Sequence, residues 1–231
     1  MVDEQYPLPS QAELETARSA FYENELRDLF YRAANYLVSQ AFDGDSPLTV
    51  GEAIGVLLQT WNQAYYRYHK PSKRHLDDLE ALIAKYQVRL LRWRNTSICG
   101  LTDESGVPEV FEDFERLLGP VGASKALHLL CPKLFPLWDR AITKAYRVWL
   151  GPTGTNGKCY ADFMAVCRNQ VTNLYPTGSA PDDILKQLDE YNYCRFDTYR
   201  PGEKSAEERK SALDMLADFA IFCSSVAWTL P

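Results

Sequence analysis

The residue types best suited to chemistry gather in one segment of the sequence, residues 118–139. Near the start of this segment, the residues Gly119-Pro-Val-Gly122 predict a hairpin. Glycines there let backbone amides approach an anion closely, at the positive end of the helix that follows. Lys125 lies one turn into that helix, where its amine can add a positive charge or act as a nucleophile if it is desolvated. The segment therefore predicts an anion-binding turn beside a lysine.

The same segment ends on a carboxylate. Phe135-Pro-Leu-Trp-Asp139 is an extended, apolar run that delivers Asp139 to the start of the next helix. One interpretation is that Asp139 only caps that helix. The other is that the carboxylate faces an apolar cleft, where it would stabilise a developing cation or orient a water molecule.

This arrangement resembles the helix-hairpin-helix DNA glycosylase superfamily, which includes endonuclease III and 8-oxoguanine glycosylase. Its signature is a G-x-G hairpin, a catalytic lysine soon after it, and an apolar loop that ends in P-x-D. The resemblance covers residues 109–150 and implies that Gly119 and Gly122 grip a DNA phosphate. It also implies that Asp139 is the catalytic aspartate and Lys125 the Schiff-base lysine, which would attack the sugar carbon of a flipped nucleotide.

The sequence departs from that pattern at several points. The hairpin is G-P-V-G, and Lys125 follows its last glycine by three residues, so that Ser124 takes the strict lysine register. The stretch from Gly122 to Asp139 is also a few residues shorter than the usual pattern. No four-cysteine loop follows, so no iron–sulfur cluster is expected. The further DNA contacts that we expect are Ser124, Lys133, Arg140 and Lys144.

Two rival functions remain open. The first is a non-enzymatic helical module that binds a protein or a nucleic acid, with Lys125 and Asp139 joined in a structural ion pair. The second is a small-molecule-binding helical protein, for which the sequence offers no specific support. No metal or other cofactor is expected: His128 and Cys131 share a helix face without a second ligand pair, and residues 151–158 depart from the phosphate-binding loop pattern.

The elements that must position these residues are helices. Capping boxes at Ser10 and Thr49 start two apolar-periodic stretches, the first of which buries a face through Leu14, Phe21, Leu26, Leu29, Ala33 and Tyr36. Further helices are expected from about 72 to 94, 109–118, 123–130, 138–150, 158–175, 181–193, and from 205 onward. Strand patterns are almost lacking, with one short option at 195–199. The fold class predicted is all-α, a compact multi-helix domain with a helix-hairpin-helix-like element and little or no sheet.

Charge is distributed unevenly along the 231 residues. The total is −6, which by itself argues against a nucleic-acid partner. Residues 67–94 nevertheless carry eight basic against three acidic side chains, and residues 121–150 carry five against one. Such segregation either builds a positive face for duplex DNA or reflects ordinary solvated helix faces.

We expect a single helical domain over 1–231, with residues 10–70 as an optional subdomain packed on 72–231. No apolar run approaches the roughly 18 residues that a membrane helix needs, and the acidic N-terminus lacks the layout of a signal peptide. The six cysteines are scattered, which is typical of reduced thiols. Together these features predict a cytoplasmic protein with no membrane partner.

Overall fold

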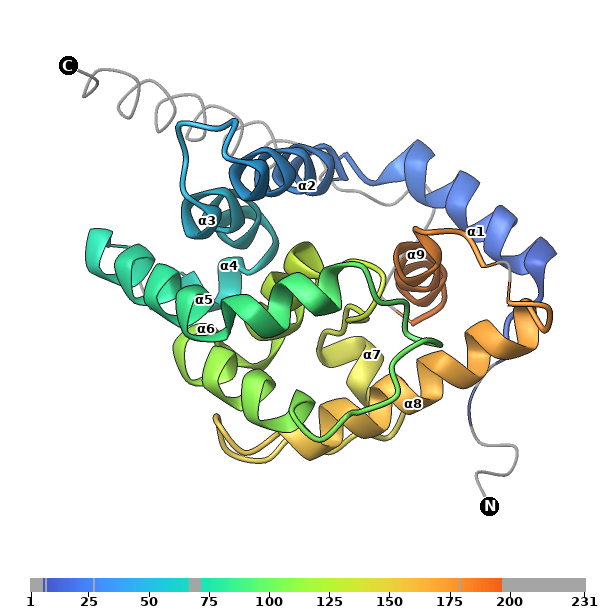
Figure 1. Cartoon of the computed structure of the whole chain (residues 1–231). Coiled ribbons are helices and arrows are strands. Elements are labelled where there is room, and N and C mark those ends of the chain that lie inside the picture. Colours follow the sequence, from blue (N-terminus) through green and yellow to red (C-terminus); the bar gives the residue numbers. More distant parts are fainter. Residues whose placement is uncertain (1–5, 7, 27, 67–71, 179, 197–231) are drawn as a thin grey trace. The chain divides into compact units, whose positions relative to one another are not determined.

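A computed structural model describes residues 6, 8–26, 28–66, 72–178 and 180–196 of the chain. The chain divides after residue 197 into two units, and the second unit lies wholly outside the described residues, as does the helix expected from 205 onward. The helices of the first unit are α1 (Gln11–Asn24), α2 (Asp28–Asp43), α3 (Val50–Trp61), α4 (Gln63–Tyr66), α5 (Lys73–Arg94), α6 (Val107–Leu130), α7 (Arg140–Ala145), α8 (Gly157–Leu174) and α9 (Ile184–Phe196) (Figure 1).

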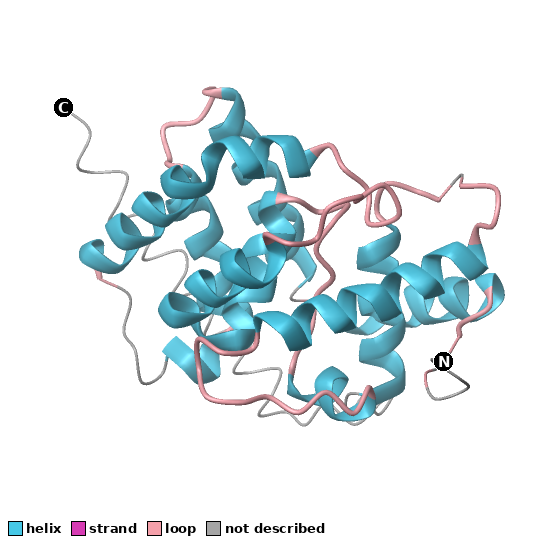
Figure 2. Ribbon diagram, turned by 60° about the horizontal axis from the view of Figure 1, so that its bottom comes forward, coloured by secondary structure: helices cyan, strands magenta, loops and turns pink. Residues whose placement is uncertain are grey.

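Helices and loops account for all of the described residues, and no strand occurs among them (Figure 2). The all-α prediction is therefore confirmed. Residues 195 and 196, where a short strand was an option, belong to α9. Within the described ranges, no helix combines the length and the apolar character that crossing a membrane would take.

Both predicted capping boxes form. The Ser10 hydroxyl accepts a hydrogen bond from the Glu13 amide at 3.2 Å, and the Glu13 carboxylate accepts one from the Ser10 amide at 2.8 Å. Thr49 and Glu52 repeat this geometry at the start of α3. These side chains satisfy amides that have no partner inside the helix, so each helix begins where the sequence indicates.

The first apolar stretch is two helices rather than one. The chain leaves helical geometry at Glu25, and α2 begins at Asp28 with a different phase. The prediction that Leu26, Leu29 and Tyr36 are buried is therefore wrong: they are 75%, 51% and 65% exposed. The buried face of α2 is instead formed by Phe30, Tyr31, Ala34 and Val38.

The predicted hairpin is a sharp kink within α6. Gly119 has φ of +71°, a left-handed conformation that glycine adopts without penalty, and Pro120 begins the second half of the helix. From Gly122 to Leu130 this second half is buried at every position. Buried side chains on all faces mark a central helix.

Helices pack in pairs, some consecutive in the sequence and some distant in it. α1 lies along α9, α2 along α3, and α6 contacts both α5 and α8 (Figure 1). Aromatic rings fill the interior beside α6: Phe111 stacks on Tyr160 with ring centroids 4.1 Å apart, and Trp138 meets Tyr160 edge-on at 4.9 Å. The core therefore holds the segment after α6, which ends at Asp139, against α8.

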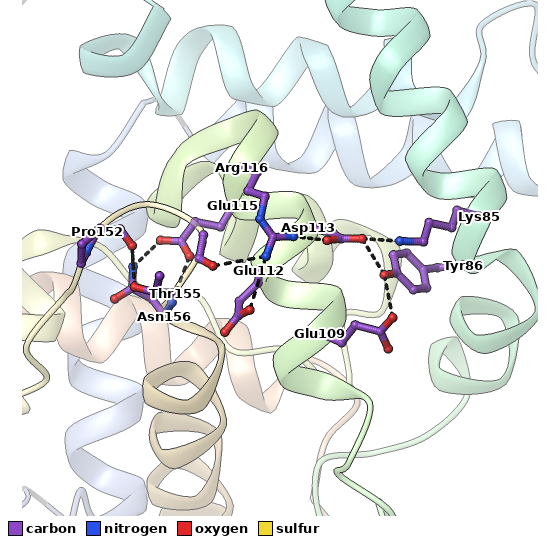
Figure 3. A network of polar contacts seen from close by, with 11 residues as sticks. Lys85, Tyr86, Glu109, Glu112, Asp113, Glu115, Arg116, Pro152, Thr155 and Asn156 are labelled. Carbon is purple, nitrogen blue, oxygen red and sulfur yellow. Dashed lines mark hydrogen bonds and ion pairs between the residues drawn. The ribbon is translucent and has the colours of Figure 1, made fainter.

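A polar network on the first half of α6 fixes its neighbours (Figure 3). Asp113 accepts hydrogen bonds from Lys85 and Tyr86 of α5 and from Arg116. The fully buried carboxylate of Glu115 accepts from the backbone and side-chain amides of Asn156. The glycine-rich loop at 151–157 is thus fastened to α6 through Asn156, which is the arrangement of a structural connector.

Gly157→Ala is expected to be strongly destabilising. An added Cβ would lie 2.7 Å from both the Pro108 carbonyl carbon and its Cα, and backbone atoms cannot move aside cheaply. Overpacking of this kind costs about 1–3 kcal/mol or more. Urea denaturation followed by circular dichroism measures the loss. Gly100→Ala is the matched control, because its nearest neighbour is the Ser97 hydroxyl at 3.2 Å; equal stability of the two variants would contradict the expectation.

Candidate functional site

One cavity in the described part of the chain is lined by ionisable and aromatic side chains. Its volume is about 140 Å³, and α1, α3, α6 and α9 contribute to its wall, together with the segment that leads into α7. The residues that line it are Phe21, Glu25, Trp61, Lys125, Leu137, Trp138, Asp139, Asp189 and Tyr193. Aromatic surfaces and ionisable groups thus line one cavity.

Lys125 reaches this cavity from the buried half of α6. Its side chain is almost fully buried, and its ammonium donates a hydrogen bond to the backbone carbonyl of Trp61, the last residue of α3. The same nitrogen lies 5.7 Å from the centre of the Trp61 ring, within cation–π range. The positive charge therefore lies at the C-terminal end of α3, which is the negative end of the helix dipole.

Asp139 enters from the opposite end of the apolar run. It caps α7, and its carboxylate accepts the Ile142 amide at 2.8 Å. The residues before it are held firmly, because the Trp138 indole donates to the Pro120 carbonyl at 2.9 Å and the Ser124 hydroxyl donates to the Trp138 carbonyl at 3.1 Å. Asp139 is half-buried. It is consequently both a helix cap and a cavity wall.

The structure brings Lys125 and Asp139 together. Their described hydrogen bonds run to different groups, Lys125 to Trp61 and Asp139 to Ile142. Both side chains border the same cavity.

Three further ionisable groups of the cavity were not assigned from the sequence. The Tyr193 hydroxyl donates to the buried Glu25 carboxylate at 2.6 Å. Asp189 lies one helical turn before Tyr193 on α9. Burial raises the pKa of Asp189 to about 7; Lys186 opposes this rise, whereas Asp139 and Glu190 add to it through like-charge repulsion.

A cluster of buried charged side chains adjoins the part of the cavity that α9 forms. The Lys186 ammonium lies 3.0 Å from Glu190, 3.4 Å from Asp28 and 3.9 Å from Asp189. It also lies 4.1 Å from the ring centre of Phe21. Burial disfavours the ammonium, but the three carboxylates outweigh that effect and raise the pKa of Lys186.

One pattern in the sequence indicates the polar face of α9 that borders the cavity. Lys186, Asp189, Glu190 and Tyr193 follow the i, i+3, i+4, i+7 spacing of a single helix face. A face of this kind is normally apolar where a helix packs on others. Ionisable residues at its positions signal a polar interior, but the signal does not say which helix α9 faces.

The hairpin glycines do not line the cavity. The ring of Tyr65 covers Gly119, and the side chain of Asn62 lies against Gly122. Tyr65 also donates to the Leu117 carbonyl at 2.7 Å. Ser124, the residue in the strict lysine register, is fully buried and bonded to backbone.

The predicted basic contacts divide into two groups. Lys133 forms an ion pair with Asp182 at 2.7 Å. Arg140 and Lys144 are exposed on α7 next to the cavity, and Arg147 and Trp149 follow them on the surface. These cations form a candidate phosphate-binding surface, here called the α7 surface and defined by Arg140, Lys144 and Arg147.

Three basic residues of the stretch 67–94 form contacts within the fold. Lys85 pairs with Asp113, and Arg89 with Glu109 at 3.2 Å. Arg94 donates to the Leu130 carbonyl at the end of α6, at 2.7 Å. Residues 67–71 lie outside the described residues. Lys73, Arg74 and Arg92 are exposed on α5, so both basic stretches present positive charge at the surface. The α7 surface differs in that it follows directly after Asp139, which lines the cavity.

His128 is a hydrogen-bonded core residue. Its ring contacts the Phe135 carbonyl at 2.7 Å and the Tyr31 hydroxyl at 2.9 Å. Burial lowers the pKa of His128 to about 4, so the ring is neutral at physiological pH. No group of three His, Cys, Asp or Glu residues suited to a metal ion occurs in the described part of the chain.

Comparison of this chain with protein-family models, with curated proteins and with solved structures gives no match in any of the three.

Proposed function

We propose that the cavity receives a nucleobase flipped out of duplex DNA and that Asp139 and Lys125 promote cleavage of its N-glycosidic bond. The observation that carries this proposal is that Lys125 and Asp139, fourteen residues apart, border one aromatic cavity. Enzymes that act on a base in DNA extrude it into a pocket and hold it by stacking and hydrogen bonds. An acid and a cation in such a pocket are placed to act on the bond to the sugar.

The size and walls of the cavity suit a planar ring. A single water molecule needs roughly 10–15 Å³, so a volume of about 140 Å³ has room for a group the size of a heteroaromatic base. Phe21, Trp61 and Trp138 supply aromatic surface. Stacking of a base on such a side chain contributes about 1–3 kcal/mol.

Hydrolysis at this site would need little rearrangement. As the bond between base and sugar breaks, its electron pair leaves with the base and positive charge develops on the sugar. The Asp139 carboxylate stabilises that charge and accepts the proton of the water that adds to the sugar carbon. Direct attack by Lys125 would demand more, because its nitrogen must first leave the Trp61 carbonyl and lose a proton. We therefore assign the chief role to Asp139.

DNA binding is expected to depend on the α7 surface. Each phosphate contact steepens the dependence of affinity on salt, so Arg140→Ala and Lys144→Ala should each reduce the slope of log K against log salt by about 1. Fluorescence anisotropy of a labelled duplex at several salt concentrations measures the slope. Lys158→Ala is the control, because Lys158 is exposed and paired with Asp162 on α8. A change in Lys158→Ala equal to that in the α7 variants would contradict the assignment.

A base-release assay tests the proposal directly. Duplexes that each carry one damaged or mismatched base are incubated with the full chain, and abasic sites are detected by alkaline strand cleavage. Borohydride is added in parallel, because it reduces the imine that an attacking lysine forms and so traps a covalent adduct. An adduct that is lost in Lys125→Ala supports lysine chemistry.

The remaining outcomes separate this proposal from its rivals. Base release without an adduct supports hydrolysis assisted by Asp139. Salt-dependent binding without release from any duplex would identify a non-enzymatic DNA-binding module. Absence of both binding and release overturns the nucleic-acid function.

A further inference from the structure

We propose that Asp189 is a second acid of the cavity, which in its protonated form donates a hydrogen bond to a ring nitrogen of a bound heteroaromatic base. The inference deepens the proposed function and rests on it in one respect, the nature of the ligand. Asp189 borders the cavity from α9, whereas Asp139 borders it from the start of α7. The two carboxyl groups thus reach one space from different elements.

Their surroundings differ in a way that separates their roles. Asp139 is half-buried and accepts a backbone N–H from Ile142, so its carboxylate serves as an acceptor. The side chain of Asp189 is 15% exposed. Burial raises the pKa of Asp189 to about 7, so a large share of the molecules carry its proton at neutral pH. Two carboxyl groups whose environments differ in this way are the usual basis of an acid and base assignment.

Burial is the first reason that Asp189 holds a proton, and the nearby ammonium of Lys186 does not offset it. On its own helix, Lys186 lies nearer to Glu190 and to Asp28 of α2 than to Asp189. The single ammonium is therefore shared among three carboxylates, and Asp189 is the farthest from it. Protonation of Asp189 relieves repulsion within the cluster.

Other packed elements contribute further charges. Asp139 at the start of α7 raises the pKa of Asp189, and Lys125 on α6 lowers it. α1 contributes Arg18, which lies 3.9 Å from Glu190, and Glu25 follows at its end. Acidic groups outnumber basic ones in this set.

A protonated carboxyl group is a hydrogen-bond donor, and purines present ring nitrogens as acceptors. The same proton can complete base release. When the bond between base and sugar breaks, the base nitrogen takes the electron pair and accepts the Asp189 proton, while Asp139 accepts the proton of the incoming water. Asp189 is then reprotonated from solvent.

Binding of free adenine as a function of pH tests this role without requiring catalysis. Ligand-observed NMR is recorded from about pH 5.5 to about pH 8.5, a range that spans the titration of Asp189. In the wild-type chain, affinity should fall about tenfold for each pH unit above 7, because only the protonated acid donates. In Asp189→Asn the amide donates at every pH, so binding should persist and lose its pH dependence. Indole, which has no ring-nitrogen acceptor, serves as the control ligand.

Adenine binding by the Asp139→Asn variant provides a second test. Removal of the Asp139 charge lowers the pKa of Asp189, so the fall in adenine affinity should begin at a lower pH than in the wild-type chain. Adenine binding that does not vary with pH in the wild-type chain overturns the inference, as does absence of adenine binding at every pH. pH-dependent adenine binding together with no base release from any duplex would support the acid and refute the enzymatic step.

The pH dependence of stability tests the protonation of Asp189 without a ligand. The pKa of Asp189 is higher in the folded chain than its ordinary 3.8, so folding is favoured at low pH and loses that contribution as the pH rises towards 7. Asn does not ionise. The urea midpoint of Asp189→Asn should therefore exceed that of the wild type by more at about pH 8 than at about pH 5. An equal difference at both pH values would overturn the protonated state on which the proposal depends.

Discussion

Asp139→Asn is expected to lower the rate of base release by about 10²–10⁴-fold, the range that general acid–base groups contribute. The variant keeps the size of the side chain and its capping role, since Asn is as good an N-cap as Asp. It removes the negative charge that would stabilise the sugar cation and the base that would accept a proton from water. The effect is measured as the single-turnover rate of base release from whichever of the damaged or mismatched duplexes reacts fastest.

Two controls make this result specific. Asp162→Asn changes a carboxylate that is exposed on α8 and paired with Lys158 at 3.0 Å, so its rate should match the wild type. The urea midpoint of Asp139→Asn should stay close to that of the wild type, because the Ile142 amide keeps an acceptor. Unchanged base release in a folded Asp139→Asn would remove Asp139 from the mechanism.

Lys186→Met is expected to destabilise the fold by about 3–5 kcal/mol at neutral pH. The Lys186 side chain is 5% exposed, and its ammonium lies within 4 Å of the carboxylates of Asp28, Asp189 and Glu190. Its removal leaves the buried Asp28 and Glu190 carboxylates with Arg32 at 3.2 Å and Arg18 at 3.9 Å as remaining partners, and loss of a buried partner typically costs this much. The substituted side chain retains most of the length that packs on Phe21. Chemical denaturation followed by tryptophan fluorescence measures the change.

The loss in Lys186→Met should shrink as the pH falls. Protonation of Asp189 and Glu190 removes their repulsion, and the pKa values of both are already raised in the folded chain. Lys158→Met is the matched control, since this exposed pair with Asp162 contributes only about 0.3–0.5 kcal/mol. The assigned role of the ion cluster would be contradicted if Lys186→Met lost no more stability than Lys158→Met. It would also be contradicted if the loss of stability grew at low pH.

Much of the helical framework follows from local rules. The capping boxes at Ser10 and Thr49 start helices where expected, because the bonds that form a cap lie within four residues. The buried stripe of α5 includes Leu79, Ile83 and Leu90, as helical spacing predicts. α8 begins at Gly157, one residue before the expected start, since a loop rich in glycine precedes it.

The incorrect boundaries have physical causes that no local rule contains. The helix expected over 138–150 is only Arg140–Ala145, because Arg147 adopts φ of +55° and ends it. The break at Glu25 shifts the phase of α2, so residues assigned to its buried face point outward. In both places a break in helical backbone geometry interrupts a continuous apolar pattern.

From the amino-acid order alone it follows that this chain is helical, where most of its helices begin, and that Lys125 and Asp139 lie at the two ends of one apolar segment. Packing between helices places both residues at a cavity, covers the hairpin glycines with Tyr65 and Asn62, and adds Asp189 from α9. Periodicity specifies which face of a helix is buried, whereas the identity of the helix that covers it depends on packing between segments more than a hundred residues apart. Asp189 is acidic in any context, and its proton at neutral pH comes from that packing.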